Sequence, residues 1–166
     1  MTTIQRLTGA DRDAVEAARL LTNRSWMSTY PPLIGEDVTA DIVVTRHSAE
    51  LFAEQAAAPG TAFLVALNGA GTVIGHCYVF EKEGWYIDRL HVEPGLKGGG
   101  IGRAMIAEAE RLSPHRRVWL DVLQGNDAAM GFYERVGYTR AGETDECGGL
   151  AGIPAIIFEK SVQLGP

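Results

Sequence analysis

The sequence has 166 residues, 46% of them apolar, which is enough to bury the core of one globular domain spanning residues 1–166. No run approaches the roughly 18 consecutive apolar residues of a membrane helix, and the first residues lack the pattern of a signal peptide. The formal net charge of −6 argues against nucleic acid as a partner. Cys77 and Cys147 have no metal-ligand spacing, so we expect no metal site and reduced thiols in a cytoplasmic protein.

Hydrophobic periodicity predicts a β–α–α–β–β–β pattern for the first part of the chain. Asp11 is expected to cap the first helix, and Tyr30-Pro31-Pro32 to end that helical segment. Asn68-Gly69-Ala70-Gly71 is a good turn sequence between two apolar strands. The expected elements are a strand over 2–7, a helix from Asp11 to about Trp26, a helical region over 38–57 in one or two pieces, and strands over 62–67, 73–80 and 85–92.

The second part of the chain is expected to continue as α–β–α–β–β. A helix begins at about Ile101, buries one face and stops before Pro114. A buried strand follows over 118–123, and Gly137 is placed to cap the C-terminus of the next helix. The remaining elements are strands over 138–143 and 153–162, separated by a loop of uncertain order over 146–152.

A glycine-dense loop joins the strand over 85–92 to the helix that begins near Ile101. Free N–H groups and the helix dipole attract an anion there, and glycines let the backbone approach it closely. The loop is not a Walker motif, because Gly102-Arg103-Ala104 lacks Lys-Ser/Thr, and neither register gives a dinucleotide fingerprint. Phosphate binding by main chain is one interpretation, and a glycine-rich turn without a ligand is the other.

Two sequence blocks resemble the GNAT superfamily of acyl-CoA-dependent N-acetyltransferases. The first has Leu90, Val92, Pro94, Gly100 and Gly102 in register, with Lys97 where the family prefers Arg or Gln. The second block, about twenty residues later, is similar to the family's Asn-x-x-Ala, Phe-Tyr, Gly-Phe/Tyr signature. It comprises Val118-Trp-Leu-Asp-Val-Leu123 and Asn126-Asp-Ala-Ala-Met-Gly-Phe-Tyr133-Glu-Arg-Val-Gly137-Tyr138. The resemblance is sharp over 84–140 and only architectural over 1–80.

The resemblance implies an α/β fold with one GNAT-like domain. We expect a central, mixed, mostly antiparallel sheet of six or seven strands, flanked by about four helices. Its parallel pair is expected between the strands over 85–92 and 118–123, linked by one right-handed crossover. The resemblance also implies acetyl-CoA as cosubstrate between these two strands. The residues expected to contact it are Leu90, His91, Val92, Lys97, Gly98, Gly99, Gly100, Ile101, Gly102, Arg103, Asn126 and Tyr133.

Two catalytic residues are carried over from the family pattern. Tyr133 matches the general acid that protonates the departing thiolate, a reasonable donor since an ordinary phenol has a pKa of about 10; packing on the helix face is the alternative. Asp88 is the best candidate for the general base, because Tyr86, Asp88 and Leu90 share one face by strand alternation. An ion pair with a basic side chain from a neighbouring strand, or a water-facing position, is the alternative for Asp88. The next candidates for the base are Glu83 and Glu81.

Several other polar and aromatic residues are expected to have structural or binding roles. His91 is expected on the opposite face from Asp88, and Asp121 is not expected to be catalytic. Asn126 is expected to cap its helix as well as to meet the pantetheine amides. Aromatic residues that would line an acceptor pocket, with core packing as the alternative, are Trp26, Tyr30 and Trp85.

The expected function is acetyl transfer from acetyl-CoA to an amine by direct attack, since neither Cys77 nor Cys147 has a nucleophile context. A small primary amine is favoured as acceptor, because the acidic balance suits a cation. The alternative is a catalytically silent acetyl-CoA-binding sensor or scaffold module. Neither nucleic acid nor a membrane is expected as a partner, and a homodimer is left open.

Overall fold

Seven strands form one mixed sheet in the computed structural model, which describes residues 1–165. The strand order is β1-β2-β3-β4-β5-β7-β6, and β4 with β5 is the parallel pair among otherwise antiparallel neighbours, as predicted. The strands are β1 (Thr3–Arg6), β2 (Thr61–Leu67), β3 (Val73–Glu81), β4 (Trp85–Val92), β5 (Arg117–Leu123), β6 (Thr139–Cys147) and β7 (Leu150–Ser161).

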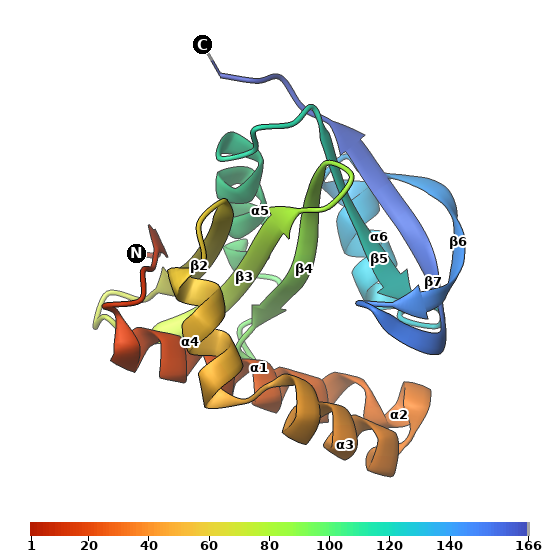
Figure 1. The fold of residues 1–166 in the computed structure, drawn as a ribbon, viewed down its shortest axis with the longest axis horizontal. Helices are drawn as coiled ribbons and strands as arrows, with labels where there is room; N and C mark the ends of the chain where they lie inside the picture. The colour runs from red at the N-terminus through yellow and green to blue at the C-terminus, as the bar shows by residue number, and fades with distance from the viewer. Residues whose placement is uncertain (166) are drawn as a thin grey trace.

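Helices cover both faces of this sheet (Figure 1). On one face, α1 and α4 bury a core around Leu21, Phe52 and Phe63; on the other, α5 and α6 bury a core around Met105 and Phe158. None of the helices in residues 1–165 is long and apolar enough to cross a membrane. The helices are α1 (Arg12–Thr29), α2 (Pro31–Ile34), α3 (Glu36–Arg46), α4 (Ala49–Ala57), α5 (Ile101–Arg111) and α6 (Asp127–Arg135).

Residues 1–165 therefore contain six helices rather than about four. The helical region expected over 38–57 forms two helices, α3 and α4. Ser48 is the N-cap of α4, and its hydroxyl accepts a hydrogen bond from the Leu51 amide at 3.1 Å. Pro31 is the first residue of the short α2. Proline is tolerated there because the amide N–H that it lacks would have no acceptor within the helix. Asp11 is the N-cap residue of α1, as predicted, but its side chain makes no capping hydrogen bond: the carboxylate accepts from the amide of Thr8 at 2.7 Å instead.

The segment over 146–152, expected as a loop, is the tip of a hairpin. Cys147 pairs with Leu150, so β6 and β7 run almost to the turn. Gly148 and Gly149 make this turn with φ of +57° and +78°, values that favour glycine. The hairpin consequently reaches farther along the sheet than the sequence suggests.

The parallel pair β4–β5 is short. Only Trp85 with Val118 and Tyr86 with Trp119 are in register, after which β5 continues its pairing with β7 alone. In Figure 1 the two strands diverge toward α1, which crosses the open end of the gap. The splay leaves the facing edge of β4 without a strand partner, and this is the place that positions the site.

Candidate functional site

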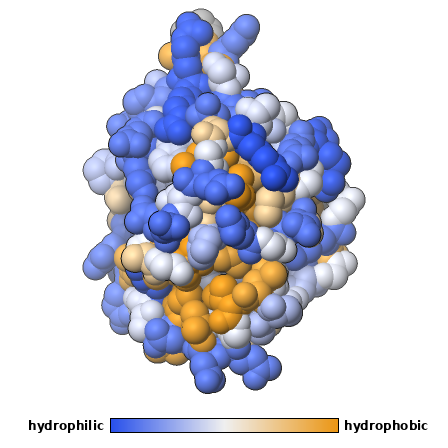
Figure 2. Space-filling model, turned by 90° about the vertical axis from the view of Figure 1, so that its right-hand side faces the viewer, coloured by the Kyte–Doolittle hydropathy of each residue, from blue (hydrophilic) through white to orange (hydrophobic). Residues whose placement is uncertain are grey.

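A cavity of about 840 Å³ occupies the splay between β4 and β5. Its walls come from the loop after β4, from α6 and from both strands, and it is closed by α1, α2, α3 and the tip of the β6–β7 hairpin. Figure 2 shows that the face containing this hairpin is hollowed and that apolar surface gathers at its lower end, where α2 and α3 lie in Figure 1. Most of the residues predicted from sequence to contact the cosubstrate therefore line one cavity.

The glycine loop presents unpaired backbone amides to one end of the cavity. Within residues 1–165, no protein group accepts a hydrogen bond from the amides of 98–103. Gly98 and Gly100 have φ of +89° and +84°, and no atom lies within 4 Å of the position of an added Cβ at either. Free donors, open space and the start of α5 are together what a pyrophosphate group requires, so these residues fit coenzyme A.

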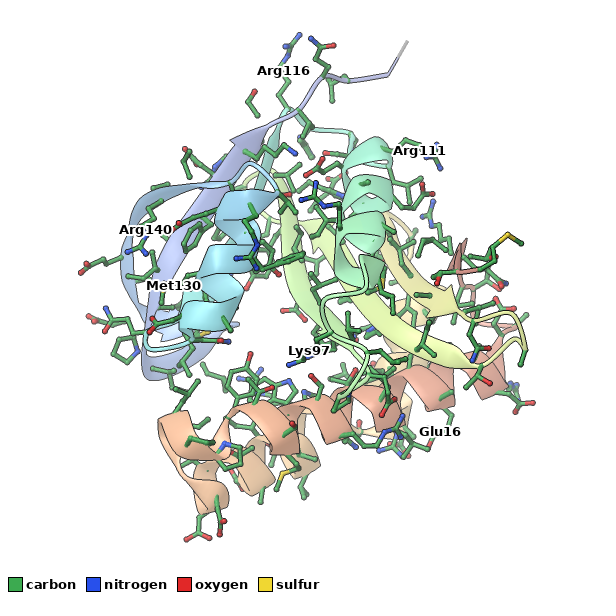
Figure 3. The ribbon with its side chains drawn as sticks, turned by 180° about the vertical axis from the view of Figure 1, so that it is seen from behind. Glu16, Lys97, Arg111, Arg116, Met130 and Arg140 are labelled. Atoms are coloured by element: carbon green, nitrogen blue, oxygen red, sulfur yellow. The ribbon has the colours of Figure 1, made fainter. Side chains whose placement is uncertain are left out.

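Two basic residues, Lys97 in the loop and Arg103 just after it, also line the cavity. In Figure 3 the side chain of Lys97 points from the loop toward the space beside α6. Arg103 lies in the first turn of α5. Gly99 and Ile101 are not among the cavity-lining residues; the side chain of Ile101 is buried in the core, so only its amide remains a candidate ligand.

The open edge of β4 supplies further backbone groups. The amide of Glu93 donates to Ile74 on β3 at 2.9 Å, and because strand amides alternate, those of Leu90 and Val92 point the other way, toward the splay. Their side chains pack against the α5–α6 core. This packing leaves their backbone groups free to bind a ligand. This edge can pair with an extended amide-containing chain such as pantetheine.

Helix α6 places Asn126 and Tyr133 on the opposite wall. The side chain of Asn126 accepts from the Ala129 amide at 3.3 Å, which confirms the predicted cap. Tyr133 is only 7% exposed, and its ring packs against Phe132, Tyr138 and Phe158. Burial raises the pKa of Tyr133 well above its ordinary value, so the hydroxyl keeps its proton and can act as a donor.

A β-bulge at Asp88 changes the face on which β4 side chains lie. Tyr78 pairs with Arg89 but Val79 pairs with Ile87, so Asp88 is the extra residue. The prediction that Tyr86, Asp88 and Leu90 share a face is therefore wrong for Leu90. Its side chain lies on the other face of the sheet, against the α5–α6 core. His91 is likewise brought to the side of Asp88, where its Nδ1 lies 2.8 Å from the Ser25 hydroxyl.

The bulge also puts Asp88 next to a buried cation. Arg89 is 7% exposed, and its Nη1 lies 3.5 Å from Oδ2 of Asp88. Its guanidinium also donates to Gln55 and to Nε2 of His76, and lies 4.1 Å from the centre of the Phe52 ring. Asp88 therefore does form an ion pair, but with the adjacent residue of its own strand rather than with a neighbouring strand, and both side chains line the cavity.

Burial raises the pKa of Asp88 above its ordinary value; Arg89 opposes this shift, and the charge of Asp121 adds to it. A carboxylate with a raised pKa and a place in the cavity is suited to accept a proton. The two reserve candidates lie outside the cavity. Glu81 is 57% exposed beside His115, and Glu83 lies in the β3–β4 turn with φ of +50°.

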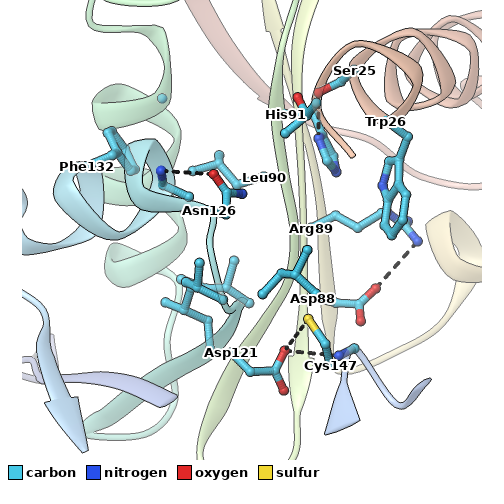
Figure 4. A pocket seen from close by; sticks show the side chains of 18 of the residues that line it. Ser25, Trp26, Asp88, Arg89, Leu90, His91, Asp121, Asn126, Phe132 and Cys147 are labelled. Atoms are coloured by element: carbon cyan, nitrogen blue, oxygen red, sulfur yellow. Dashed lines mark hydrogen bonds and ion pairs between the residues drawn. The ribbon is translucent and has the colours of Figure 1, made fainter. Parts of the chain in front are cut away.

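Sequence reasoning missed two cavity residues, Asp121 and Cys147. Oδ1 of Asp121 accepts from the Tyr86 hydroxyl and from the Gly148 amide, both at 3.0 Å, and Cys147 Sγ lies 3.9 Å away. Figure 4 shows the carboxylates of Asp121 and Asp88 on either side of Cys147. Alternation along β5 puts Asp121 on the side of Trp119, away from the buried Leu120, and this was the available signal.

Two of the three aromatic residues proposed for the acceptor pocket do line the cavity. The Trp26 and Tyr30 rings stack with centroids 4.1 Å apart on its wall. Trp85 does not: it is 3% exposed in the core, and its indole N–H donates to the carbonyl of Ala109 at 2.9 Å. The region expected as an acceptor pocket is therefore lined mainly by residues of α1–α4 and the hairpin tip, and Trp85 at the start of β4 is not part of it.

Comparisons with known proteins agree with this architecture. The family model described as "Acetyltransferase (GNAT) family" matches residues 23–138. The peptidyl-lysine N-acetyltransferase YjaB of Escherichia coli K12 is 28% identical over 115 residues, which cover 68% of this chain and 75% of that protein. The N-alpha-acetyltransferase RimI of Mycobacterium tuberculosis is 31% identical over 99 residues, covering 55% of this chain and 60% of its own length.

A solved structure has the same fold over nearly the whole chain. PaiA N-acetyltransferase from Thermoplasma acidophilum, in complex with coenzyme A, superposes with a TM-score of 0.78 at 23% identity. The match covers 98% of this chain and 99% of the other. The similarity therefore extends through the N-terminal helices, beyond the two sequence blocks.

Proposed function

This chain belongs to the GNAT acetyltransferase family, and from that premise we propose that it transfers an acetyl group from acetyl-CoA directly to a small primary amine. One observation carries the proposal. The splay of β4 and β5 brings the free amides of the glycine loop, Tyr133 and Asp88 to the wall of a single cavity. The loop amides then bind the acetyl donor, Tyr133 donates a proton, and Asp88 accepts one.

The donor is held by main chain. The amides of 98–103 receive the pyrophosphate at the start of α5, with Lys97 and Arg103 adding charge-assisted contacts. The splayed edge of β4 hydrogen-bonds the pantetheine arm, and an amide of that edge, from Leu90 or Val92, polarises the thioester carbonyl. This donor is preorganised, because the rest of β4 is fixed by its pairing with β3.

Asp88 and Tyr133 act on opposite sides of the reaction. Asp88 takes a proton from the acceptor ammonium, directly or through water, so that the neutral amine forms the new C–N bond. The C–S bond breaks, and the Tyr133 hydroxyl gives its proton to the departing sulfur. The raised pKa of Asp88 gives this carboxylate a higher affinity for a proton, which suits a base, and Tyr133 carries the proton that it donates.

Direct attack is favoured over an acetyl-cysteine route. Burial raises the pKa of Cys77 to about 12, and burial with the nearby Asp121 raises that of Cys147 to about 12. Both are therefore thiols at neutral pH and poor nucleophiles. Loss of activity in Cys77→Ala or Cys147→Ala, with coenzyme binding intact, would contradict direct transfer.

Calorimetry with acetyl-CoA, followed by thiol release against chemically distinct amines, tests the proposal. We expect binding and turnover with at least one small primary amine. Binding without turnover on any amine would instead support a silent acetyl-CoA-binding module. Turnover only on a protein N-terminus or a lysine-containing peptide would keep the reaction but overturn the small-amine acceptor.

A further inference from the structure

The acceptor end of the cavity contains two carboxylates on adjacent strands. Asp88 lies at the bulge of β4, and Asp121 lies on β5 beyond the point where the strands part. Burial raises the pKa of Asp88 and of Cys147; the charge of Asp121 adds to the shift of Asp88, and both carboxylates add to the shift of Cys147. Arg89 partly offsets the charge of Asp88, whereas in residues 1–165 no cationic side chain forms an ion pair with Asp121, so a bound cation would lower the cost of placing two like charges together.

Each carboxylate also has an oxygen without a protein partner. The hydrogen bonds to Asp121 all use Oδ1, and the ion pair of Asp88 uses Oδ2, so in residues 1–165 nothing donates to Oδ2 of Asp121 or Oδ1 of Asp88. The protein cations that lower the pKa of Asp88 are Arg89, which is held by Gln55 and His76, and, with smaller effects, Lys82 and Arg46. The free oxygens are available to a ligand.

The surrounding wall is mostly aromatic and apolar, but it also contains Ser25, Thr29, Arg46 and Gln55. The Trp26 and Tyr30 rings lie at the cavity wall with centroids 4.1 Å apart and planes tilted by 36°. An aromatic ring attracts an ammonium ion that approaches its face. Six apolar side chains complete this end of the cavity: Ile34, Ile42, Leu51, Phe80, Leu150 and Ile153. Such a wall stabilises a hydrocarbon body by removing it from water.

We propose that Asp121 is an acceptor-binding residue that, together with Asp88, binds the acceptor as a primary ammonium ion carried on an apolar body. Asp121 anchors the cation, while Asp88 removes its proton. The inference rests on the function proposed above and narrows its acceptor class. It also gives Asp121 a role beyond holding Tyr86 and the hairpin turn.

Paired probes test the cation preference without turnover. Binding of 2-phenylethylammonium and of its neutral analogue 2-phenylethanol is measured by calorimetry, with the chain alone and saturated with coenzyme A. We expect the ammonium ion to bind at least about tenfold more tightly, as for one desolvated charge-assisted contact. Equal affinities, or no binding of either probe, would overturn the inference.

The variant Asp121→Asn retains an oxygen that accepts from Tyr86 and Gly148 but removes the charge. We expect it to weaken 2-phenylethylammonium binding about tenfold and to leave 2-phenylethanol binding unchanged. Asp145→Asn is the matched control, because Asp145 is an exposed β6 residue outside the cavity. Unchanged ammonium binding in Asp121→Asn, or an equal loss in the control, would contradict the assignment.

A pH profile separates anchoring from a merely structural role. Removing the charge of Asp121 should lower the pKa of Asp88, so the acid limb of kcat/KM for 2-phenylethylamine should move to lower pH in Asp121→Asn. A limb that does not move would contradict the coupling. Failure of the wild-type chain to bind acetyl-CoA would overturn the proposed function, whereas loss of the ammonium preference alone would overturn only this inference.

Discussion

The two halves of the cavity are built in different ways. The donor half uses backbone groups of one continuous segment, the end of β4 and the loop into α5, with α6 opposite. The acceptor half uses side chains from α1, α2, α3, α4, β4, β5 and the β6–β7 hairpin. Under the proposed function, the first half binds coenzyme A and the second binds the acceptor.

This difference implies different sensitivity to substitution. A backbone cradle tolerates any side chain that leaves the main chain in place, but it fails when a Cβ occupies the space of the ligand. A side-chain cradle depends on charge and burial, so it responds to conservative replacement and to pH. The following experiments test whether the halves separate in this way.

The largest effect is expected for Gly100→Val in the donor half. The Cβ would project into the open space at the start of α5, and φ of +84° disfavours a branched residue, so acetyl-CoA binding should be abolished. Calorimetry measures the loss. Gly95→Val is the matched control, since Gly95 has φ of +96° but lies outside the cavity. If both variants lost binding equally, loop strain rather than contact with the ligand would be the cause.

Tyr133→Phe should separate chemistry from binding. Loss of the proton donor is expected to lower kcat by roughly tenfold to a thousandfold, with acetyl-CoA affinity nearly unchanged. Tyr138→Phe is the control, because the Tyr138 hydroxyl donates to Glu110 at 3.0 Å and lies outside the cavity. Normal turnover by Tyr133→Phe in a steady-state assay would show that another group protonates the sulfur.

Asp88→Asn should lower kcat/KM by about a hundredfold near neutral pH, in the range for loss of a general base. In the wild type the pKa of Asp88 is raised, so activity should fall as the pH drops through a value above the ordinary pKa of an aspartate. The variant should lose this acid limb. Glu81→Gln, on an exposed side chain at the end of β3, should behave as wild type; the reverse pattern would reassign the base.

The smallest effect is expected on the stability of the fold, at two buried histidines of the cavity wall. Burial lowers the pKa of His91 to about 3 and that of His47 to about 4. Because the folded form cannot take up the proton that the unfolded chain binds below about pH 6.5, each histidine should cost about 1.4 kcal/mol of stability per pH unit as the pH falls from there toward 4.

Urea denaturation at pH 7, 6 and 5 measures this slope. His91→Asn, which can still hydrogen-bond Ser25, should flatten the slope by the share of one histidine. An unchanged slope in the variant would mean that His91 is protonated in the folded protein.

Much of the fold could be read from local pattern. β4 was predicted with the bounds that the structure gives it, and α5 begins at Ile101 after the glycine loop as expected. The parallel pairing of β4 with β5 followed from the resemblance to the family and is confirmed. The bulge at Asp88 was not predictable, because inserting one residue into a ladder depends on how β3 pairs across from it.

The sequence by itself determined the donor half: the glycines at 98–102, the apolar edge residues Leu90 and Val92, and the placement of Tyr133 after Asn126 are contiguous or nearly so. Backbone chemistry over a short segment leaves a short-range signature. Only the tertiary structure decided the acceptor half, where Trp26, Asp88 and Asp121 meet. Their proximity is created by strand divergence, a bulge and a hairpin tip, which are consequences of long-range pairing and packing that no local spacing encodes.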